Sequence, residues 1–340
     1  MLDRVLIWGA GAIGGTVGAV LARKGVDVTF VDVVPEHVAA IDASGLTVVG
    51  PVEAFTVAAP AVRPEALTGT WRHVFLCVKA QHTADAAERL KPFLAPDAYV
   101  VSLQNGLCEM ELEARLGRQR VIGAFVNFGA DYLEPGKVIF SGRGAFVLGE
   151  LDGAMTPRLA ALLETIQLFE PGAIATDRIF AYLWGKLGYA SLLFAQALGD
   201  LGIADCLARE ELLPLFRRLA GETMRVARAE GVAPLGFNGF DPAAFMPEAS
   251  EADARRCVAD MVAFNRPSAK THSGIWRDLA IRKRRTEVDQ LVAPIVTIGA
   301  RHGIDCPTLA RLVEMIHEVE EGDRLMSDDN LLVLADETAG

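Results

Sequence analysis

The sequence has no excess of positive charge and no paired cysteines. It carries 33 Lys and Arg against 44 Asp and Glu, a net charge of −11 at pH 7. Such a surface repels a polyphosphate backbone, so nucleic acid is not an expected partner. The 5 cysteines are an odd number, and no two of them are spaced as Cys-x-x-Cys. We therefore expect reduced thiols and a cytoplasmic location rather than a disulfide framework.

Long apolar runs are also missing. The nearly uncharged stretch 187–199 has 13 residues, fewer than the roughly 20 that cross a bilayer. The chain passes from Met1 directly into a strand-like run, so we expect no secretion signal and no membrane partner. No cluster of His, Cys and carboxylates has the spacing of a metal site, and we expect no metal. The length of 340 residues suggests about two globular domains.

The first half of the chain alternates strand-like and helical segments. Apolar, β-branched runs predict strands at 5–8, 26–31, 73–78, 99–103 and 121–126. Helical spacing predicts helices at 13–24, 82–90 and 108–116. Continuous apolar strands suit a sheet that is covered on both faces. The pattern therefore predicts an α/β fold with a doubly wound parallel sheet.

After this region the pattern changes twice. Gly-rich segments at 137–140 and 145–148 predict a hairpin that closes one edge of the sheet. From residue 178 onward the apolar spacing is helical, which predicts an all-α second domain. We place the two domains at 1–177 and 178–330, and we expect the last dozen residues to fray.

A glycine-rich turn follows the first predicted strand and opens the first helix. Its three glycines, Gly9, Gly11 and Gly14, stand where a dinucleotide-binding turn needs glycine. The reasons are a tight turn, close approach of the pyrophosphate, and close helix–strand packing, in that order. Ala12 and Ile13 complete the turn, and the free N–H groups of the helix N-terminus would bind the phosphates. The sequence therefore predicts a bound dinucleotide.

Asp32 ends the second predicted strand, 23 residues beyond Gly9. A carboxylate at this place accepts hydrogen bonds from the adenosine ribose hydroxyls and repels a 2′-phosphate. No Lys or Arg occurs at 33–36 to pair such a phosphate. NAD(H) is therefore the preferred cofactor, with NADP(H) as the alternative. The alternative interpretation is that Asp32 has no binding role and is simply a solvated residue at the end of a strand.

Five segments occur in the order that a known family shows: Gly9-Ala-Gly-Ala-Ile-Gly14, Cys77-Val-Lys-Ala80, Leu103-Gln-Asn-Gly106, Trp184-Gly-Lys-Leu187 and Thr286-Glu-Val-Asp289. On these segments the sequence resembles the ketopantoate reductase (2-dehydropantoate 2-reductase) family over nearly its whole length. The resemblance implies a Rossmann domain, a helical domain like that of 6-phosphogluconate dehydrogenase, and a cleft between them. It also implies hydride transfer between a nicotinamide and the C2 carbonyl of a 2-oxo acid, and a homodimer.

The resemblance further implies roles for single residues. Lys79 and Asn105 would line the nicotinamide side of the cofactor, although either is also an ordinary loop residue. Lys186 would be catalytic, since an ammonium stabilises the negative charge that forms on the carbonyl oxygen and supplies the proton. The alternative is a lysine that extends from an apolar helix to water. Glu287 would be its partner, although the segment 286–289 also resembles a capping box that starts a helix.

The chain departs from the family pattern near the expected substrate. Family members typically carry Asn four and eight residues after the lysine, on one helix face, where this chain has Ala190 and Phe194. We hypothesise that these residues line a site for a less polar or bulkier 2-oxo acid than ketopantoate, either branched or aryl. Ser273 matches the substrate-binding serine of the family. His272 is a further candidate for binding the substrate carboxylate.

A basic run, Arg282-Lys-Arg-Arg285, precedes the Glu287 segment. Its simplest interpretation is a solvated helical surface, and the alternatives are a phosphate clamp or a polyanion-binding patch.

Three functions follow from these observations. The leading hypothesis, which the resemblance implies, is an NADH-preferring reductase of a 2-oxo acid, either a 2-dehydropantoate 2-reductase or a close relative with an altered substrate. A close alternative runs the same chemistry in reverse, as an NAD-dependent D-2-hydroxy-acid dehydrogenase. The third is a non-catalytic NAD(H)-sensing protein, which would bind the cofactor without needing Lys186.

Overall fold

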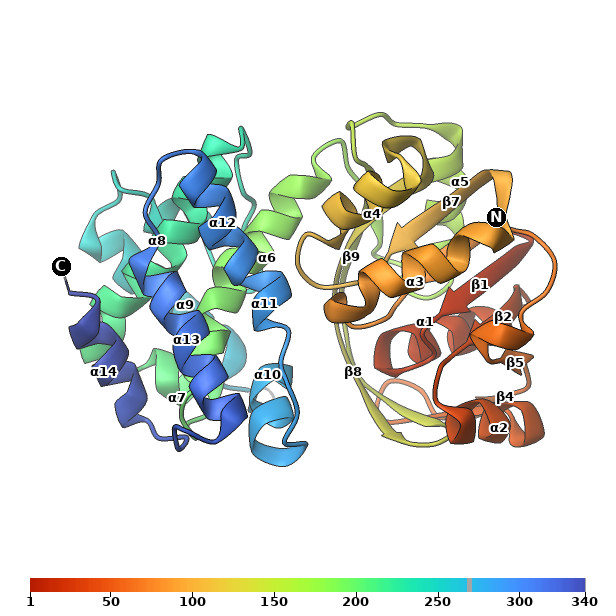
Figure 1. The fold of residues 1–340 in the computed structure, drawn as a ribbon, viewed down its shortest axis with the longest axis horizontal. Coiled ribbons are helices and arrows are strands. Elements are labelled where there is room, and N and C mark those ends of the chain that lie inside the picture. The colour runs from red at the N-terminus through yellow and green to blue at the C-terminus, as the bar shows by residue number, and fades with distance from the viewer. Residues whose placement is uncertain (268–270, 340) are drawn as a thin grey trace. The chain divides into compact units, whose positions relative to one another are not determined.

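The computed structural model describes residues 1–267 and 271–339. These residues form two compact units, Met1–Ile179 and Phe180–Gly340 (Figure 1). The observed boundary lies two residues after the expected one at 177/178.

The first unit is an α/β structure built on a ten-stranded sheet. Its strands are β1 (Arg4–Trp8), β2 (Asp27–Val31), β3 (Leu46–Val49), β4 (Phe55–Val57), β5 (Ala61–Val62), β6 (Trp71–Leu76), β7 (Leu94–Ser102), β8 (Val121–Glu134), β9 (Lys137–Glu150) and β10 (Ile174–Ala175). Its helices are α1 (Ala12–Arg23), α2 (Pro35–Ser44), α3 (Thr83–Leu90), α4 (Cys108–Leu116) and α5 (Pro157–Ile166).

The parallel part of the sheet has the strand order of a dinucleotide-binding fold. The order is β8-β7-β6-β1-β2-β5, and all neighbouring pairs are parallel. The direction of winding reverses between β1 and β6, and ligands of such sheets bind outside the carboxyl ends of the strands at this point. The predicted doubly wound parallel sheet is confirmed, and it places the loops after β1 and β6 next to each other.

The predicted hairpin at the sheet edge is wrong. Segments 137–140 and 145–148 belong to one strand, β9, which runs antiparallel to β8. On its other side β9 pairs with β3, so it lies inside the sheet. A Cβ at Gly144 would lie 1.6 Å from the Asn127 carbonyl oxygen. This glycine therefore marks a close approach of two strands and not a turn.

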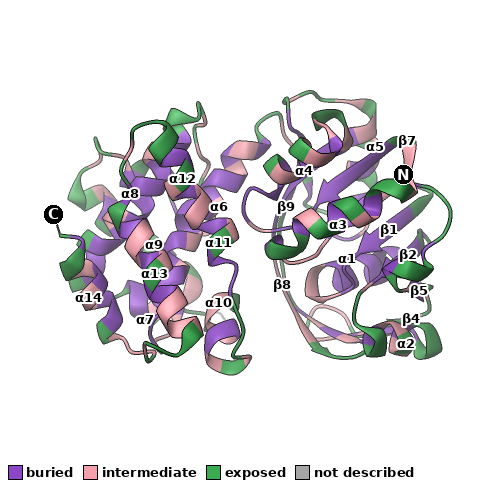
Figure 2. Ribbon diagram, in the orientation of Figure 1, coloured by how far each residue is buried: buried purple, intermediate pink, exposed green. Residues whose placement is uncertain are grey.

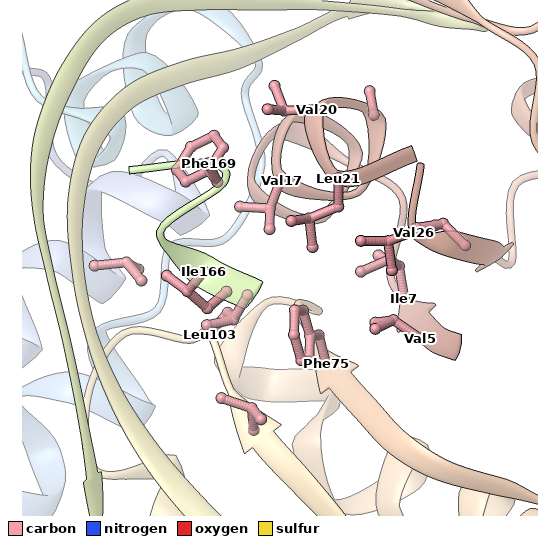
Figure 3. Close-up of a cluster of buried hydrophobic side chains, with 14 of the residues drawn as sticks. Val5, Ile7, Val17, Val20, Leu21, Val26, Phe75, Leu103, Ile166 and Phe169 are labelled. Carbon is pink, nitrogen blue, oxygen red and sulfur yellow. The ribbon is translucent and has the colours of Figure 1, made fainter. Parts of the chain in front are cut away.

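The core of the first unit fixes helix α1 against the sheet. Figure 3 shows side chains of several elements in one buried cluster, among them Val17 and Leu21 of α1, Ile7 of β1 and Phe75 of β6. A Cβ at Gly18 of α1 would lie 2.5 Å from the Phe30 ring, so the helix and β2 approach closely. Burial of each large aliphatic side chain contributes about 1.5–3 kcal/mol. This packing holds the glycine-rich turn between β1 and α1 in place.

The second unit is helical in its described part and has no strand there, as expected. Its helices are α6 (Ile179–Gln196), α7 (Ile203–Leu207), α8 (Leu213–Ala229), α9 (Glu251–Asn265), α10 (Gly274–Trp276), a π-helix (Arg277–Ile281), α11 (Val288–Leu291), α12 (Ala293–Arg301), α13 (Pro307–Glu321) and α14 (Asp329–Glu337). Figure 2 shows buried residues along α6 and on the inner faces of the surrounding helices. Among the described residues, no helix combines the length and the apolar character that a membrane span requires.

The C-terminal residues as far as 338 are packed rather than frayed, and the second unit extends past the expected end at 330. Asp328 Oδ1 accepts a hydrogen bond from the Asp200 N–H at 2.9 Å. The Asn330 side-chain amide donates to the Leu198 carbonyl at 3.0 Å, and Leu334 of α14 is fully buried. These contacts order the segment because it covers the end of α6.

Glu222 of α8 is buried and holds the start of α13. Its two carboxylate oxygens accept hydrogen bonds from the Thr308 and Leu309 N–H groups at 3.0 and 2.9 Å. These are N–H groups that a helix leaves without internal acceptors. Burial raises the pKa of the Glu222 carboxyl, while its hydrogen bonds with Thr308 and Leu309 oppose this shift.

Glu222→Ala should lower the free energy of unfolding of the helical unit by about 2 kcal/mol, because two buried N–H groups lose their acceptor. Calorimetry should show a Tm decrease of roughly 4–8 °C. Glu248→Ala is the control, because Glu248 is exposed and pairs with exposed Arg228, and such pairs contribute little. Two variants that both melt like the wild type would contradict this role for Glu222.

Glu222 also gives the stability a pH dependence. Its folded pKa is raised, so the folded state binds the proton more tightly than the unfolded state does. The free energy of unfolding should therefore fall as the pH rises from the ordinary glutamate pKa through the raised value, and stay constant above it. Glu222→Gln should remove this contribution in melts recorded across that range.

Candidate active site

The glycine-rich turn has the geometry that its sequence implies. Gly9 has φ +99°, and a Cβ there would lie 2.9 Å from the Val78 backbone nitrogen. A Cβ at Gly14 would lie 2.1 Å from the Gly9 carbonyl oxygen and 2.8 Å from the Ile7 side chain. Both positions therefore accept only glycine without movement of the backbone.

Gly11 differs from Gly9 and Gly14, because the space that a Cβ would occupy there is open. Apart from Gly11 itself and its two neighbours in the chain, no described residue has an atom within 4 Å of a Cβ built here. Gly11 is the N-cap of α1, and within the described residues no side chain caps this helix. Ala12 and Ile13, both half-buried, are its first residues. The open space and the first N–H groups of α1 fit the pyrophosphate of a dinucleotide.

Asp32 follows β2 and contacts the glycine-rich turn. Its Oδ2 accepts a hydrogen bond from the Ala10 N–H at 2.8 Å, and its Oδ1 accepts one from the Val34 N–H at 3.0 Å. Each carboxylate oxygen can accept two hydrogen bonds. Asp32 therefore orders the turn and keeps acceptor capacity for ribose hydroxyls.

Lys79 and Asn105 follow β6 and β7, and both are half-buried. The loops that carry them are joined by Gln104, whose side-chain amide donates to the Val78 carbonyl at 3.0 Å and to Thr83 Oγ1 at 2.8 Å. Gln104 belongs to the segment 103–106, which resembles the family, but the sequence alone indicated no role for its side chain. The structure gives it one: it fixes the spacing of the two loops.

Lys186 lies on α6 and is half-buried. The helix packs closely against its neighbours on either side of this residue. A Cβ at Gly185 would lie 1.9 Å from the Leu235 carbonyl oxygen, and one at Gly188 would lie 2.6 Å from Met224 Cε. The backbone that carries the lysine is therefore held firmly.

The two positions that depart from the family pattern differ in exposure. Ala190 and Phe194 follow Lys186 at helical spacing, on the same face of α6. Ala190 is half-buried, whereas Phe194 is 0% exposed. A substrate could contact the Phe194 ring only if the side chains that cover it moved.

Glu287 is buried and directly precedes α11. The segment is held by Thr286, whose N–H and hydroxyl both donate to Glu320 Oε1 at 2.7 Å. A helix does begin here, but the capping box does not form. Asp289 Oδ1 instead accepts a hydrogen bond from His317 Nε2 at 2.9 Å. The position of Glu287 thus depends on a contact with α13.

Ser273 and His272 are both hydrogen-bonded within the chain. Ser273 is buried, and its Oγ accepts from the Trp276 N–H at 3.1 Å, which caps α10. His272 Nε2 donates to the Asp200 carbonyl at 3.0 Å, and its Nδ1 accepts from the Thr271 hydroxyl at 2.8 Å. Their substrate-binding roles stay predictions, and binding would require these hydrogen bonds to be shared or exchanged.

The basic run at 282–285 is a loop, so the expected helical surface is wrong. The π-helix ends at Ile281, and Lys283 has φ +48°. Buried Asp278 accepts hydrogen bonds from Arg282 at 3.1 Å and from Arg284 at 2.9 Å. The buried carboxylate therefore draws these two guanidinium groups inward.

His37 is a site residue that the sequence analysis missed. It lies on α2, is 1% exposed, and its Nε2 lies 2.9 Å from the Ala10 carbonyl oxygen of the glycine-rich turn. The only buried residues of α2 are His37 and Ile41, so the segment lacks a strong apolar pattern. A proline at its first position and a glycine directly after its end mark the helix, but no sequence signal marks this histidine.

The cysteines are free thiols, as expected. Burial raises the pKa of Cys206 to about 12 and that of Cys257 and Cys306 to about 11. These groups are therefore protonated and weakly nucleophilic at neutral pH. In the part of the chain that the structure describes, no group of three or more His, Cys, Asp or Glu residues is arranged to hold a metal ion.

The candidates fall into two groups, with the cofactor residues on the first unit and the catalytic and substrate residues on the second. Comparison with known proteins assigns both units to the same protein family. Residues 5–153 match the family model for ketopantoate reductase PanE/ApbA, and residues 178–320 match the model for its C-terminal part.

Individual relatives agree with this assignment. A 2-dehydropantoate 2-reductase of Archaeoglobus fulgidus is 31% identical over 94% of this chain and 99% of its own. The crystal structure of a PanE/ApbA family ketopantoate reductase from Ralstonia eutropha JMP134 is 31% identical over the same shares, with a TM-score of 0.78. D-mandelate dehydrogenase, solved with NADH and anilino(oxo)acetate, shares the fold at 20% identity over 94% of this chain and 99% of its own, with a TM-score of 0.81. The chain therefore belongs to the ketopantoate reductase family of NAD(P)-dependent oxidoreductases.

Proposed function

We propose that this chain is an NADH-preferring enzyme that transfers hydride between the cofactor and the C2 carbonyl of a 2-oxo acid. Family membership supports the reaction class. The observation that carries the cofactor assignment is the open glycine-rich turn at Gly11 beside the Asp32 carboxylate, which accepts a hydrogen bond from the Ala10 N–H at 2.8 Å. A bound nicotinamide supplies or accepts the hydride.

Negative charge near Asp32 supports NADH over NADPH. Burial raises the pKa of Tyr132 on β8, and the charges of Asp32, Glu36 and Glu134 raise it further. Glu134 is itself paired with Lys137 at 3.0 Å, so the negative charge that faces a cofactor comes from Asp32 and Glu36. These carboxylates therefore act on the same part of the first unit. A 2′-phosphate placed there would be repelled, whereas ribose hydroxyls would be accepted.

In the proposed reaction the Lys186 ammonium binds the carbonyl oxygen of the substrate. It stabilises the negative charge that develops there during reduction and supplies the proton that makes the hydroxyl group. In the direction of oxidation the neutral amine of Lys186 accepts this proton from the substrate hydroxyl. Glu287, placed by the Thr286–Glu320 contact, orients the ammonium or accepts a hydrogen bond from the substrate hydroxyl.

The substrate that we propose is a branched or aryl 2-oxo acid. The support is Ala190, which offers a methyl group one helical turn after Lys186 where family members typically carry an amide. A related fold, D-mandelate dehydrogenase, holds anilino(oxo)acetate, an aryl compound of this kind. A site without the two amides would lose discrimination in favour of a polar substrate.

Initial rates with a panel of acids test this function. The panel contains ketopantoate, branched 2-oxo acids and aryl 2-oxo acids with NADH and NADPH, and the matching D-2-hydroxy acids with NAD and NADP. We expect a higher kcat/KM for the branched or aryl acids than for ketopantoate. A clear preference for ketopantoate would contradict the substrate assignment, and faster oxidation than reduction would favour the D-2-hydroxy-acid dehydrogenase. The homodimer implied by the family stays a prediction.

Asp32→Asn should lower kcat/KM for NADH by about tenfold and raise the NADPH-to-NADH ratio. The amide keeps the shape of the side chain but loses the charge and part of its acceptor capacity, which is worth roughly 1–2 kcal/mol. Asp27→Asn is the matched control, because Asp27 begins β2, the strand that Asp32 follows, and pairs on the surface with Arg4 at 3.6 Å. Unchanged cofactor selectivity in Asp32→Asn would refute the proposed preference.

A further inference from the structure

The Ala10 residue is hydrogen-bonded on both of its backbone polar groups by side chains that follow β2. Its N–H donates to Asp32 Oδ2 at 2.8 Å, and its carbonyl oxygen accepts from His37 Nε2 at 2.9 Å. Since a carbonyl only accepts, Nε2 of His37 carries a proton. Ala10 is fully buried and His37 is 1% exposed, so both contacts are shielded from water.

The other nitrogen of the His37 ring is also used. The Gly136 N–H donates to His37 Nδ1 at 2.9 Å, which makes the ring the neutral Nε2–H form. Gly136 has φ +76° and lies in the turn between β8 and β9. Tyr132 of β8 packs edge-on against the ring, with the centroids 5.1 Å apart. His37 therefore joins the glycine-rich turn to the β8–β9 turn.

The contact with the Ala10 carbonyl has a consequence at Gly11. The Ala10 C=O and the Gly11 N–H belong to one planar peptide unit, in which they point in opposite directions. A donor that holds the carbonyl therefore also fixes the direction of the Gly11 N–H. Gly11 is the residue with open space at its Cβ position, where the pyrophosphate would approach.

We propose that His37 is a positioning residue for cofactor binding, which orients the Gly11 N–H toward the pyrophosphate through its hydrogen bond to the Ala10 carbonyl. This inference rests on the proposed dinucleotide function. His37 touches neither substrate nor reacting atoms. It acts on the binding of the cofactor, so its loss should change the Kd and KM for NADH and leave kcat nearly unchanged.

Two conservative variants separate the two contacts of the ring. His37→Gln places an amide donor near the Nε2 position and loses the acceptor at Nδ1. His37→Asn keeps an acceptor near Nδ1 and loses the donor to Ala10. Thr165→Val is the stability control in the same unit, because buried Thr165 accepts from the Leu2 N–H at 2.8 Å on helix α5, outside the glycine-rich turn.

The experiment measures the Kd for NADH by fluorescence titration, steady-state kinetics and Tm for the wild type and all three variants. We expect the Kd and KM for NADH to rise about tenfold in His37→Asn and to stay within about threefold in His37→Gln, with kcat within about twofold. Wild-type Kd in His37→Asn overturns the inference. The inference is also overturned if His37→Asn and His37→Gln lose affinity for NADH equally and Thr165→Val, with the same Tm as these variants, loses as much. A wild type that binds neither NADH nor NADPH overturns the proposed function together with this inference.

Discussion

Lys186→Ala should lower kcat by about 10²–10⁴-fold, the usual contribution of a general acid. The hydroxyl proton of the product then has no donor, and the charge on the carbonyl oxygen loses its counterion. The fold should be preserved, because alanine favours a helix and the close contacts of α6 are made by Gly185 and Gly188. Steady-state kinetics, circular dichroism and NADH titration together measure these effects.

Two further variants sharpen this prediction. Lys283→Ala removes an exposed lysine from a loop of the same unit and should leave kcat unchanged. Lys186→Arg keeps the charge but gives up its proton far less readily, so it should restore only part of the rate. If Lys186→Ala retained a kcat within about fivefold of the wild type, the catalytic role would be wrong. A wild type that binds NADH and turns over none of the acids would favour the NAD(H)-sensing protein.

The parts of the fold that were predictable are those with a local physical signal. The strands β1, β2, β6, β7 and β8 each overlap the apolar run that predicts them, although β7 and β8 extend beyond it. Gly9 has φ +99°, a conformation that favours glycine, and a Cβ at Gly14 would clash with the Gly9 carbonyl oxygen within the turn itself. By contrast, the sequence predicts two strands within β9, because Gly142 and Gly144 separate its two apolar runs. Their strand conformation depends on the pairing of β9 with β8, which sequence spacing does not show.

The candidate site residues also divide into those with a local sequence signal and those that depend on tertiary contacts. Asp32, Lys79 and Asn105 lie just past strand ends, where the topology of a parallel sheet makes polar residues informative. His37 acts through tertiary contacts with Ala10 and Gly136, which lies 99 residues away, so no local pattern could identify it. Partners of this kind become visible only when the fold brings distant backbone groups together.

Gly11→Ala should raise the Kd for NADH by roughly 10–100-fold without lowering the stability of the fold. The backbone at Gly11 has φ −69° and ψ −151°, which alanine adopts, and no described atom lies within 4 Å of the new Cβ. The methyl group would instead occupy the space into which the pyrophosphate approaches. Overpacking of this kind costs about 1–3 kcal/mol. NADH titration and thermal melts of the same samples measure both quantities.

Two further glycine variants serve as controls for Gly11→Ala. Gly14→Ala should lose both Tm and affinity, because its Cβ would lie 2.1 Å from the Gly9 carbonyl oxygen in the protein itself. Gly142→Ala on β9 also meets no described atom within 4 Å and should lose neither. If Gly11→Ala bound NADH as tightly as Gly142→Ala does, the open space at the start of α1 would not be a pyrophosphate site. A loss confined to affinity at Gly11 would show that this glycine serves the ligand, whereas Gly14 serves the fold.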